Sequence, residues 1–179
     1  IATHYSKSLP SILENLMVES DNLTAELLVK IIGYEYSQIE GNWQNGLHAM
    51  KVFLHDKVSL DTTSFSISDG SGVSRYNYSS ANNFISLLSW AYHNPKIRNN
   101  LLNILSFTGE KGTLLDRALP NGVYAKTGSL SGVSTLSGYI LNPDKEPIAF
   151  SILMNGYKGS SLPFRELQDK IVSRLAEIK

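Results

Sequence analysis

The chain has 179 residues, of which 42% are hydrophobic and 18% are charged, a composition typical of one folded domain with a single core. Sixteen basic and 16 acidic residues give a formal net charge of zero, which removes any electrostatic argument for nucleic acid or an anionic membrane as a partner. There is no cysteine, the four histidines lack metal-ligating spacing, and no apolar run approaches the ~20 residues of a membrane span, so we expect no metal, no cofactor and no membrane span.

Helical periodicity dominates the first part of the chain. Pro10 opens the first helix, because the fixed φ of proline suits a first helical turn. A polar break, Glu19–Asn22, separates it from a second helix in which leucine and isoleucine recur with helical period until Gly33 weakens the pattern. Further helices are predicted from Trp43 to about residue 57, from the N-cap Ser80 to Pro95, and over residues 96–105.

Strand patterns dominate the rest of the chain. Residues 63–68 alternate like a short strand, and residues 106–121 are expected to form a loop. Three strands in hairpin order follow, over residues 122–132, 133–141 and 148–154, and an amphipathic helix closes the chain over residues 163–178. Helices followed by consecutive antiparallel strands predict an α+β fold with an antiparallel sheet flanked by helices. Three strands make a small sheet for so many helices, and such sheets usually have more strands.

The most informative motif is Lys126-Thr127-Gly128, which lies in a β-prone run flanked by glycines. A lysine, a hydroxyl and a bare backbone on one edge strand make a compact binder for a carboxylate beside an amide. Taken alone the tripeptide is weak, because roughly one chain in twenty-five of this length should contain it by chance.

A second motif, Ser20-Asp21-Asn22, lies far upstream. SxN also occurs at Ser80-Ala81-Asn82, where Ser80 is explained as a helix cap. For Ser20-Asp21-Asn22, spacing alone leaves two interpretations open. The motif is either a cap and turn that join two helices, or a functional element. Ser131, Ser134 and Ser137, which follow Lys126-Thr127-Gly128, are expected to form one ordinary polar strand face.

Three segments together resemble one family. Asn15–Leu27 is similar to the second-motif segment of the class C low-molecular-mass penicillin-binding proteins, the serine-type D-alanyl-D-alanine carboxypeptidase/endopeptidases. Ser68–Asn77 resembles their glycine-rich stretch, and Ala125–Tyr139 resembles their third-motif strand and the following hairpin. The segments fall in family order. The resemblance implies a penicillin-binding/serine β-lactamase-like transpeptidase fold.

The resemblance also has one large departure. Family members attack with the serine of an SxxK motif upstream of the second motif, and no serine in this chain has lysine three residues on. We therefore expect residues 1–179 to be the C-terminal part of a single penicillin-binding domain, incomplete at its N-terminal side. The missing strands and the missing nucleophile then share one explanation. The expected partner of the chain is the missing N-terminal part of the same protein, either absent or present as a separate fragment.

The resemblance assigns a role to each motif residue. Ser20 would take part in the proton transfer to the leaving D-alanine, and Asn22 would orient the side-chain amide of the stem peptide. Lys126 would supply positive charge and hold Ser20. Thr127 and Ser129 would bind the terminal carboxylate, and Gly128 would let the ligand approach the backbone. The backbone N–H of Ser129 is the expected second oxyanion donor.

These roles predict an enzyme that hydrolyses peptidoglycan stem peptides ending in D-Ala-D-Ala through an acyl-enzyme, and that β-lactam antibiotics acylate. The expected location is the bacterial periplasm or the exterior of the cell envelope. One alternative is a non-catalytic penicillin-binding-like protein that retains a peptide groove. A β-lactamase is less favoured, because class A enzymes carry a deacylating glutamate in an ExxLN-like setting that this chain lacks.

Overall fold

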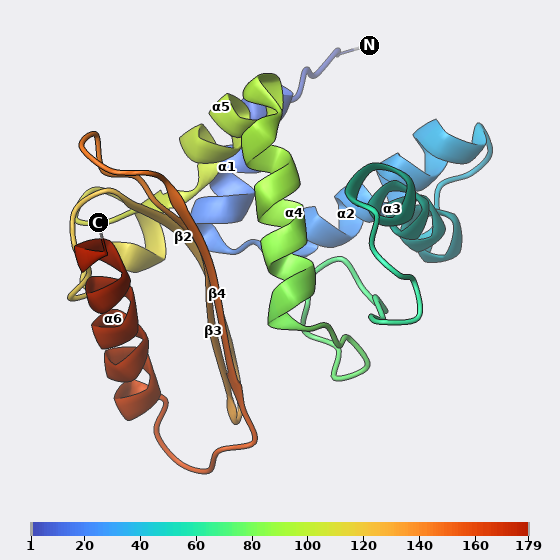
Figure 1. The fold of residues 1–179 in the computed structure, drawn as a ribbon. Coiled ribbons are helices and arrows are strands. Elements are labelled where there is room, and N and C mark those ends of the chain that lie inside the picture. Colours follow the sequence, from blue (N-terminus) through green and yellow to red (C-terminus); the bar gives the residue numbers. More distant parts are fainter. Residues whose placement is uncertain (1, 179) are drawn as a thin grey trace.

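A computed structural model describes residues 2–178 (Figure 1). The predicted helices are present, as are the three strands predicted over residues 122–154, most of them with bounds within about two residues of those expected. In chain order the elements are α1 (Leu9–Glu19), α2 (Asn22–Ser37), α3 (Trp43–Val58), α4 (Ala81–His93), α5 (Pro95–Ile104), β1 (Ser106–Phe107), the 3₁₀ helix η1 (Gly112–Leu114), β2 (Val123–Leu130), β3 (Val133–Ile140), β4 (Ile148–Asn155) and α6 (Leu162–Glu177). Within the described residues, no helix is both long enough and apolar enough to cross a bilayer.

The sheet is antiparallel, with strand order β1-β2-β3-β4. The three predicted strands pair as two hairpins, in which Lys126 lies opposite Ser137 and Ser137 lies opposite Ser151. The expectation of a plain loop from residue 106 was wrong, because Ser106 and Phe107 form β1 against Ala125 and Tyr124. The α+β prediction of an antiparallel sheet flanked by helices is confirmed.

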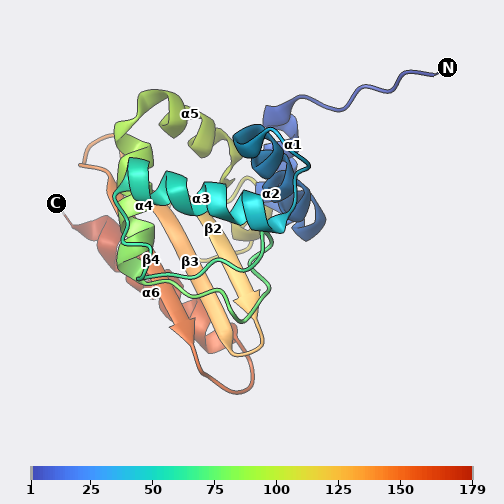
Figure 2. The same cartoon turned by 90° about the vertical axis from the view of Figure 1, so that its right-hand side faces the viewer.

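Helices cover both faces of the sheet, with α6 on one side and α4 on the other (Figures 1 and 2). The main core lies between α6 and the sheet, and its buried members are Leu114, Leu119, Val123, Ala125, Leu136, Ile140, Phe150 and Val172. On the opposite face, the buried Tyr139 donates its hydroxyl to the carbonyl oxygen of Leu88 in α4 (2.7 Å). Burial, helped by the nearby Tyr92, raises the pKa of Tyr139 to about 12.

The helices α2 and α3 pack closely through two glycines. A Cβ on Gly46 would lie 2.1 Å from the carbonyl oxygen of Val29, and one on Gly33 would lie 2.7 Å from the backbone nitrogen of Gly46. Gly33 therefore serves helix packing, and α2 continues past it to Ser37. The expected strand at residues 63–68 was wrong, because that segment makes only an isolated bridge between Ser66 and Tyr78.

The prediction of one polar serine face was also wrong. A spacing of three residues places Ser134 and Ser137 on opposite faces of β3, because strand side chains alternate with period two. Ser134 is buried on the α6 side, where the Gln168 amide donates to its carbonyl oxygen (3.0 Å). The Ser137 hydroxyl lies 2.9 Å from the hydroxyl of Ser151 on the other face.

Candidate active site

The junction between α1 and α2 presents Ser20 to the sheet. Ser20 ends α1 in the left-handed conformation, with φ 56° and ψ 48°. Its neighbour Asp21 is the N-cap of α2, accepting hydrogen bonds from the backbone of Leu23 (3.0 Å) and Thr24 (3.3 Å). Hydrogen bonds from the Thr24 side chain and backbone lower the pKa of Asp21. Because Asp21 performs the capping, the hydroxyl of Ser20 is available for another contact.

That contact is made by Lys126 of β2. Its Nζ donates to Ser20 Oγ and also to the carbonyl oxygen of Thr127 (3.0 Å). The predicted proximity of Ser20 and Lys126 is therefore present. Burial lowers the pKa of Lys126, which eases loss of its proton relative to a lysine in water.

Beyond Ala125 the edge of β2 is not covered by β1, because that pairing ends at Ala125. The carbonyl oxygen of Val123 accepts a hydrogen bond from the backbone of Thr108 (3.2 Å), so the backbone of Val123 faces the β1 side. Backbone direction alternates along a strand, and therefore the N–H of Ser129 points to the same side, past the end of β1. A ligand lying along this open edge can reach that N–H.

Sequence reasoning missed Thr113, which borders the same edge. The hydroxyl of Thr127 donates to Thr113 Oγ1 at 2.9 Å. Thr113 belongs to the short η1 and lies 14 positions from Thr127, with no periodic pattern around it to mark it. At Gly128 a Cβ would lie 2.4 Å from Thr135 Oγ1 on β3, so the absence of a side chain makes room for that threonine.

Asn22 is the first residue of α2 and is exposed. Its side chain makes no hydrogen bond to another of the residues 2–178. The structure therefore brings together Ser20, Lys126 and Thr127 by direct contacts, and places Asn22 two positions from Ser20 at the start of the next helix.

The glycine-rich loop, residues 68–77, passes close to the end of β2 (Figure 2). Glu26 of α2 holds the loop by accepting from the backbone of Gly70 (3.2 Å) and Ser71 (3.0 Å). Asp69 organises the loop from within, accepting from Gly72 and Ser74. Arg75 then donates to the carbonyl oxygen of Ser131, in the turn between β2 and β3, at 2.9 Å. These contacts fix the loop beside the motif strand.

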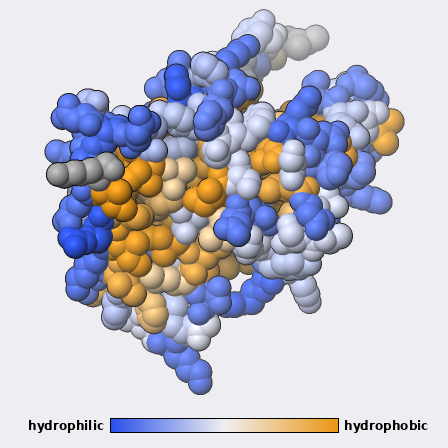
Figure 3. Space-filling view, in the orientation of Figure 1, coloured by the Kyte–Doolittle hydropathy of each residue, from blue (hydrophilic) through white to orange (hydrophobic). Residues whose placement is uncertain are grey.

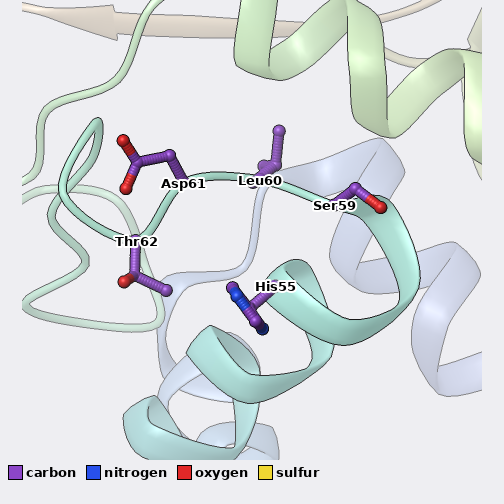
Figure 4. Close-up of a pocket in the computed structure, with 5 residues that line it drawn as sticks. All are labelled: His55, Ser59, Leu60, Asp61 and Thr62. Carbon is purple, nitrogen blue, oxygen red and sulfur yellow. The ribbon is translucent and has the colours of Figure 1, made fainter.

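A separate hollow of about 450 Å³ lies at the end of α3, lined by residues that Figure 4 labels: His55, Ser59, Leu60, Asp61 and Thr62. Its polar groups do not converge, since Asp61 points away from His55 in Figure 4 and is bonded to Thr63 (2.8 Å). Among residues 2–178, no cluster of three histidine, aspartate or glutamate side chains is suited to a metal ion. The hollow is therefore a weaker candidate than the edge of β2.

Comparisons with known proteins agree on one family. The model of the D-Ala-D-Ala carboxypeptidase 3 (S13) family matches residues 1–178. A D-alanyl-D-alanine carboxypeptidase from Actinomadura sp. is 40% identical over 99% of the chain, which corresponds to 34% of that relative. The chain thus spans about a third of the length of this relative.

Two solved structures are similar to the whole chain. Penicillin binding protein 4 (dacB) from Haemophilus influenzae, complexed with a β-lactam, has a TM-score of 0.85 and 31% identity, covering 98% of this chain and 43% of its own. An extended-spectrum β-lactamase has a TM-score of 0.73 at 19% identity, covering 95% of this chain and 63% of its own, and this likeness shows the fold alone. The fold is thus that of penicillin-binding proteins and serine β-lactamases, and the chain belongs to the D-Ala-D-Ala carboxypeptidase 3 (S13) family.

Proposed function

We propose that this chain supplies the SDN and KTG side of the active site of a serine-type D-Ala-D-Ala carboxypeptidase/endopeptidase. The enzyme acts on peptidoglycan stem peptides through an acyl-enzyme, is acylated by β-lactams, and works in the bacterial periplasm or on the exterior of the cell envelope. The hydrogen bond from Lys126 Nζ to Ser20 Oγ carries the proposal, because it joins the two motifs in one site. Family membership and the β-lactam complex of the H. influenzae protein support it.

Ser20 and Lys126 form the proton-transfer pair in this mechanism. The leaving D-alanine amine needs a proton, and the hydroxyl of Ser20 is positioned to pass one on. Lys126 donates to that hydroxyl oxygen, and its lowered pKa brings it closer to the range in which it can exchange a proton. The positive charge of Lys126 also favours a substrate with a terminal carboxylate.

The open edge of β2 binds the substrate. Ser129 offers its N–H as an oxyanion donor, a contact typically worth about 3–4 kcal/mol in the transition state. Thr127 and Ser129 offer hydroxyls to the terminal carboxylate, and Gly128 keeps the backbone accessible. Asn22 orients the amide of the stem peptide from the α2 end of the site.

The missing N-terminal part of the same protein is the proposed partner, and it brings the nucleophile. Two surfaces of the chain support this. Among residues 2–178, no strand pairs with the outer edge of β4, and Figure 3 shows an apolar area over it, between α6 and α4. The helix α2 exposes an apolar stripe, in which Leu23, Leu27 and Ile31 are 69%, 49% and 54% exposed. A long unpaired edge and an uncovered apolar stripe promote aggregation unless another segment covers them.

Labelling with a fluorescent penicillin tests the proposal. The 179-residue chain alone is expected to remain unlabelled, because no serine in it has lysine three residues on. The chain completed by its N-terminal part is expected to be labelled stoichiometrically and to release the label slowly. Replacement of Lys126 by alanine in the completed protein should reduce labelling by at least about a hundredfold. Labelling of the isolated chain, or an undiminished rate in the variant, would contradict the proposed function.

A further inference from the structure

A cluster of three hydroxyls lies beside the open edge of β2, and two of its members come from outside the KTG motif. Thr127 donates to Thr113 Oγ1 at 2.9 Å, and Ser106 Oγ lies 3.5 Å from the same Thr113 oxygen. Thr113 is exposed, whereas Ser106 is fully buried. The cluster therefore runs from the protein interior to the surface at which we place the substrate.

The backbone holds Thr113 in this position. A tight turn closes between Phe107 and Lys111, whose backbones exchange hydrogen bonds of 3.3 and 3.2 Å. Gly112 follows with φ of +69°, and a Cβ there would lie 2.3 Å from Ser106 Oγ, so the hydroxyl of Ser106 occupies the space that a side chain would need. Leu114, on the other side of Thr113, is completely buried in the main core. Thr113 is thus anchored by both neighbours.

The chemistry of the cluster suits a carboxylate. A carboxylate has two oxygens that only accept, whereas each threonine hydroxyl can donate one proton. In the free site the proton of Thr127 is satisfied by Thr113. When an anion arrives, Thr127 and Thr113 can each donate to it, and hydrogen bonds to charged groups are about twice as strong as neutral ones. Ser106 can then accept a hydrogen bond from Thr113, or donate one to it, while its own side chain stays buried.

We propose that Thr113 is a specificity-determining residue that binds the free terminal carboxylate of the ligand together with Thr127. The inference rests on the proposed function, because it deepens the same site. It adds a donor from η1 to those of the KTG strand, and assigns to Ser106 the role of a positioning residue that orients the Thr113 hydroxyl.

The test compares two probes on the completed protein: benzylpenicillin, which carries a free carboxylate, and its methyl ester, which does not. Thr113→Val keeps the shape of threonine and removes the hydroxyl. The variant is expected to be acylated about tenfold more slowly than wild type by the acid, mainly because a higher concentration of the acid is needed for the half-maximal rate. The ester is expected to acylate the variant at the wild-type rate. Thr113→Ser should restore acylation by the acid. An unchanged ester rate also shows that the variant is folded.

The possible failures can be told apart. If Thr113→Val is acylated by the acid at the wild-type rate, or slows acid and ester equally, Thr113 does not select for the carboxylate and the inference is wrong. If the wild-type protein is acylated by neither probe, the proposed function fails and the inference fails with it. A Ser106→Ala variant with reduced preference for the acid over the ester would support the positioning role, and an unchanged preference would overturn that role.

Discussion

Lys126 donates a hydrogen bond to Ser20 although 106 positions separate the two residues. The contact ties the central part of β2 to the junction of α1 and α2, and so fixes the helical part of the chain against the sheet. The same lysine is partly withdrawn from water, and its pKa is lowered for that reason. Lys126 therefore serves the site at some expense to the stability of the fold.

This expense should be visible in the pH dependence of stability. Since the pKa of Lys126 in the folded chain lies below its ordinary value of 10.5, the unfolded chain binds more protons between the two values. Stability that depends on this group therefore rises as the pH increases through that interval. Wild type should gain free energy of unfolding relative to Lys126→Met as the pH rises toward 10.5. Urea unfolding of both proteins measures this, and a change of opposite sign would contradict the burial of the ammonium group.

Glu26 should control the order of the glycine-rich loop. Burial alone would raise the pKa of Glu26, but hydrogen bonds from Ser71, Gly70 and Trp43 lower it on balance. A carboxylate with a lowered folded-state pKa stabilises the protein above its ordinary pKa of 4.5, and the effect is lost as pH falls through the folded-state value. In Glu26→Gln at neutral pH, the backbone amides of Gly70 and Ser71 should exchange with deuterium several-fold faster.

The matched control for this prediction is Glu35→Gln, on the same helix. Glu35 is exposed; its backbone oxygen accepts a hydrogen bond from Gln38, and its carboxylate makes none to the residues that the structure describes. This variant should leave exchange at Gly70 and Ser71 unchanged. Equal exchange in both variants would mean that the Glu26 carboxylate does not hold the loop.

A third prediction concerns the buried ion pair between Arg117 and Asp169. Arg117 Nη2 lies 2.6 Å from Asp169 Oδ1, and it also donates to the side chain of Gln168 (3.2 Å). Arg117→Met leaves the buried carboxylate of Asp169 unpaired and should cost about 3–5 kcal/mol in free energy of unfolding. The double variant Arg117→Met/Asp169→Leu should recover most of that loss, because it removes both charges. Chemical denaturation measures both changes, and a double variant as unstable as the single one would refute the explanation.

Much of the candidate site could be predicted because its information is local. Ser20-Asp21-Asn22 and Lys126-Thr127-Gly128 are short runs with family resemblance, and the strand period around the second motif placed it correctly on a strand. The cap and the functional element were posed as alternatives for the first motif, yet Asp21 caps α2 while its neighbour Ser20 accepts the hydrogen bond from Lys126. Local patterns were therefore sufficient to identify the motifs, and the family resemblance implied that they meet.

Other parts depend on contacts that no local pattern carries. The strand β1 has only two residues, too few for alternation to be recognised, and it exists because β2 offers it a partner. The place of Thr113 in the candidate site depends on its hydrogen bond with Thr127 in another element. In the same way, the buried position of Ser134 depends on its hydrogen bond with Gln168 in α6. Such pairings are set by tertiary packing, which overrides what a single segment indicates.

At position 20, the backbone conformation favours glycine, whereas the proposed function needs a hydroxyl. The left-handed conformation of Ser20, with φ 56° and ψ 48°, disfavours an L-residue by roughly 1–2 kcal/mol, while glycine tolerates it freely. Ser20→Gly should therefore raise the melting temperature yet abolish acylation of the completed protein, whereas Ser20→Ala should abolish acylation without the thermal gain. A laboratory selection for heat resistance alone would therefore favour glycine at position 20. The selected protein would be more stable, but penicillin would no longer acylate it.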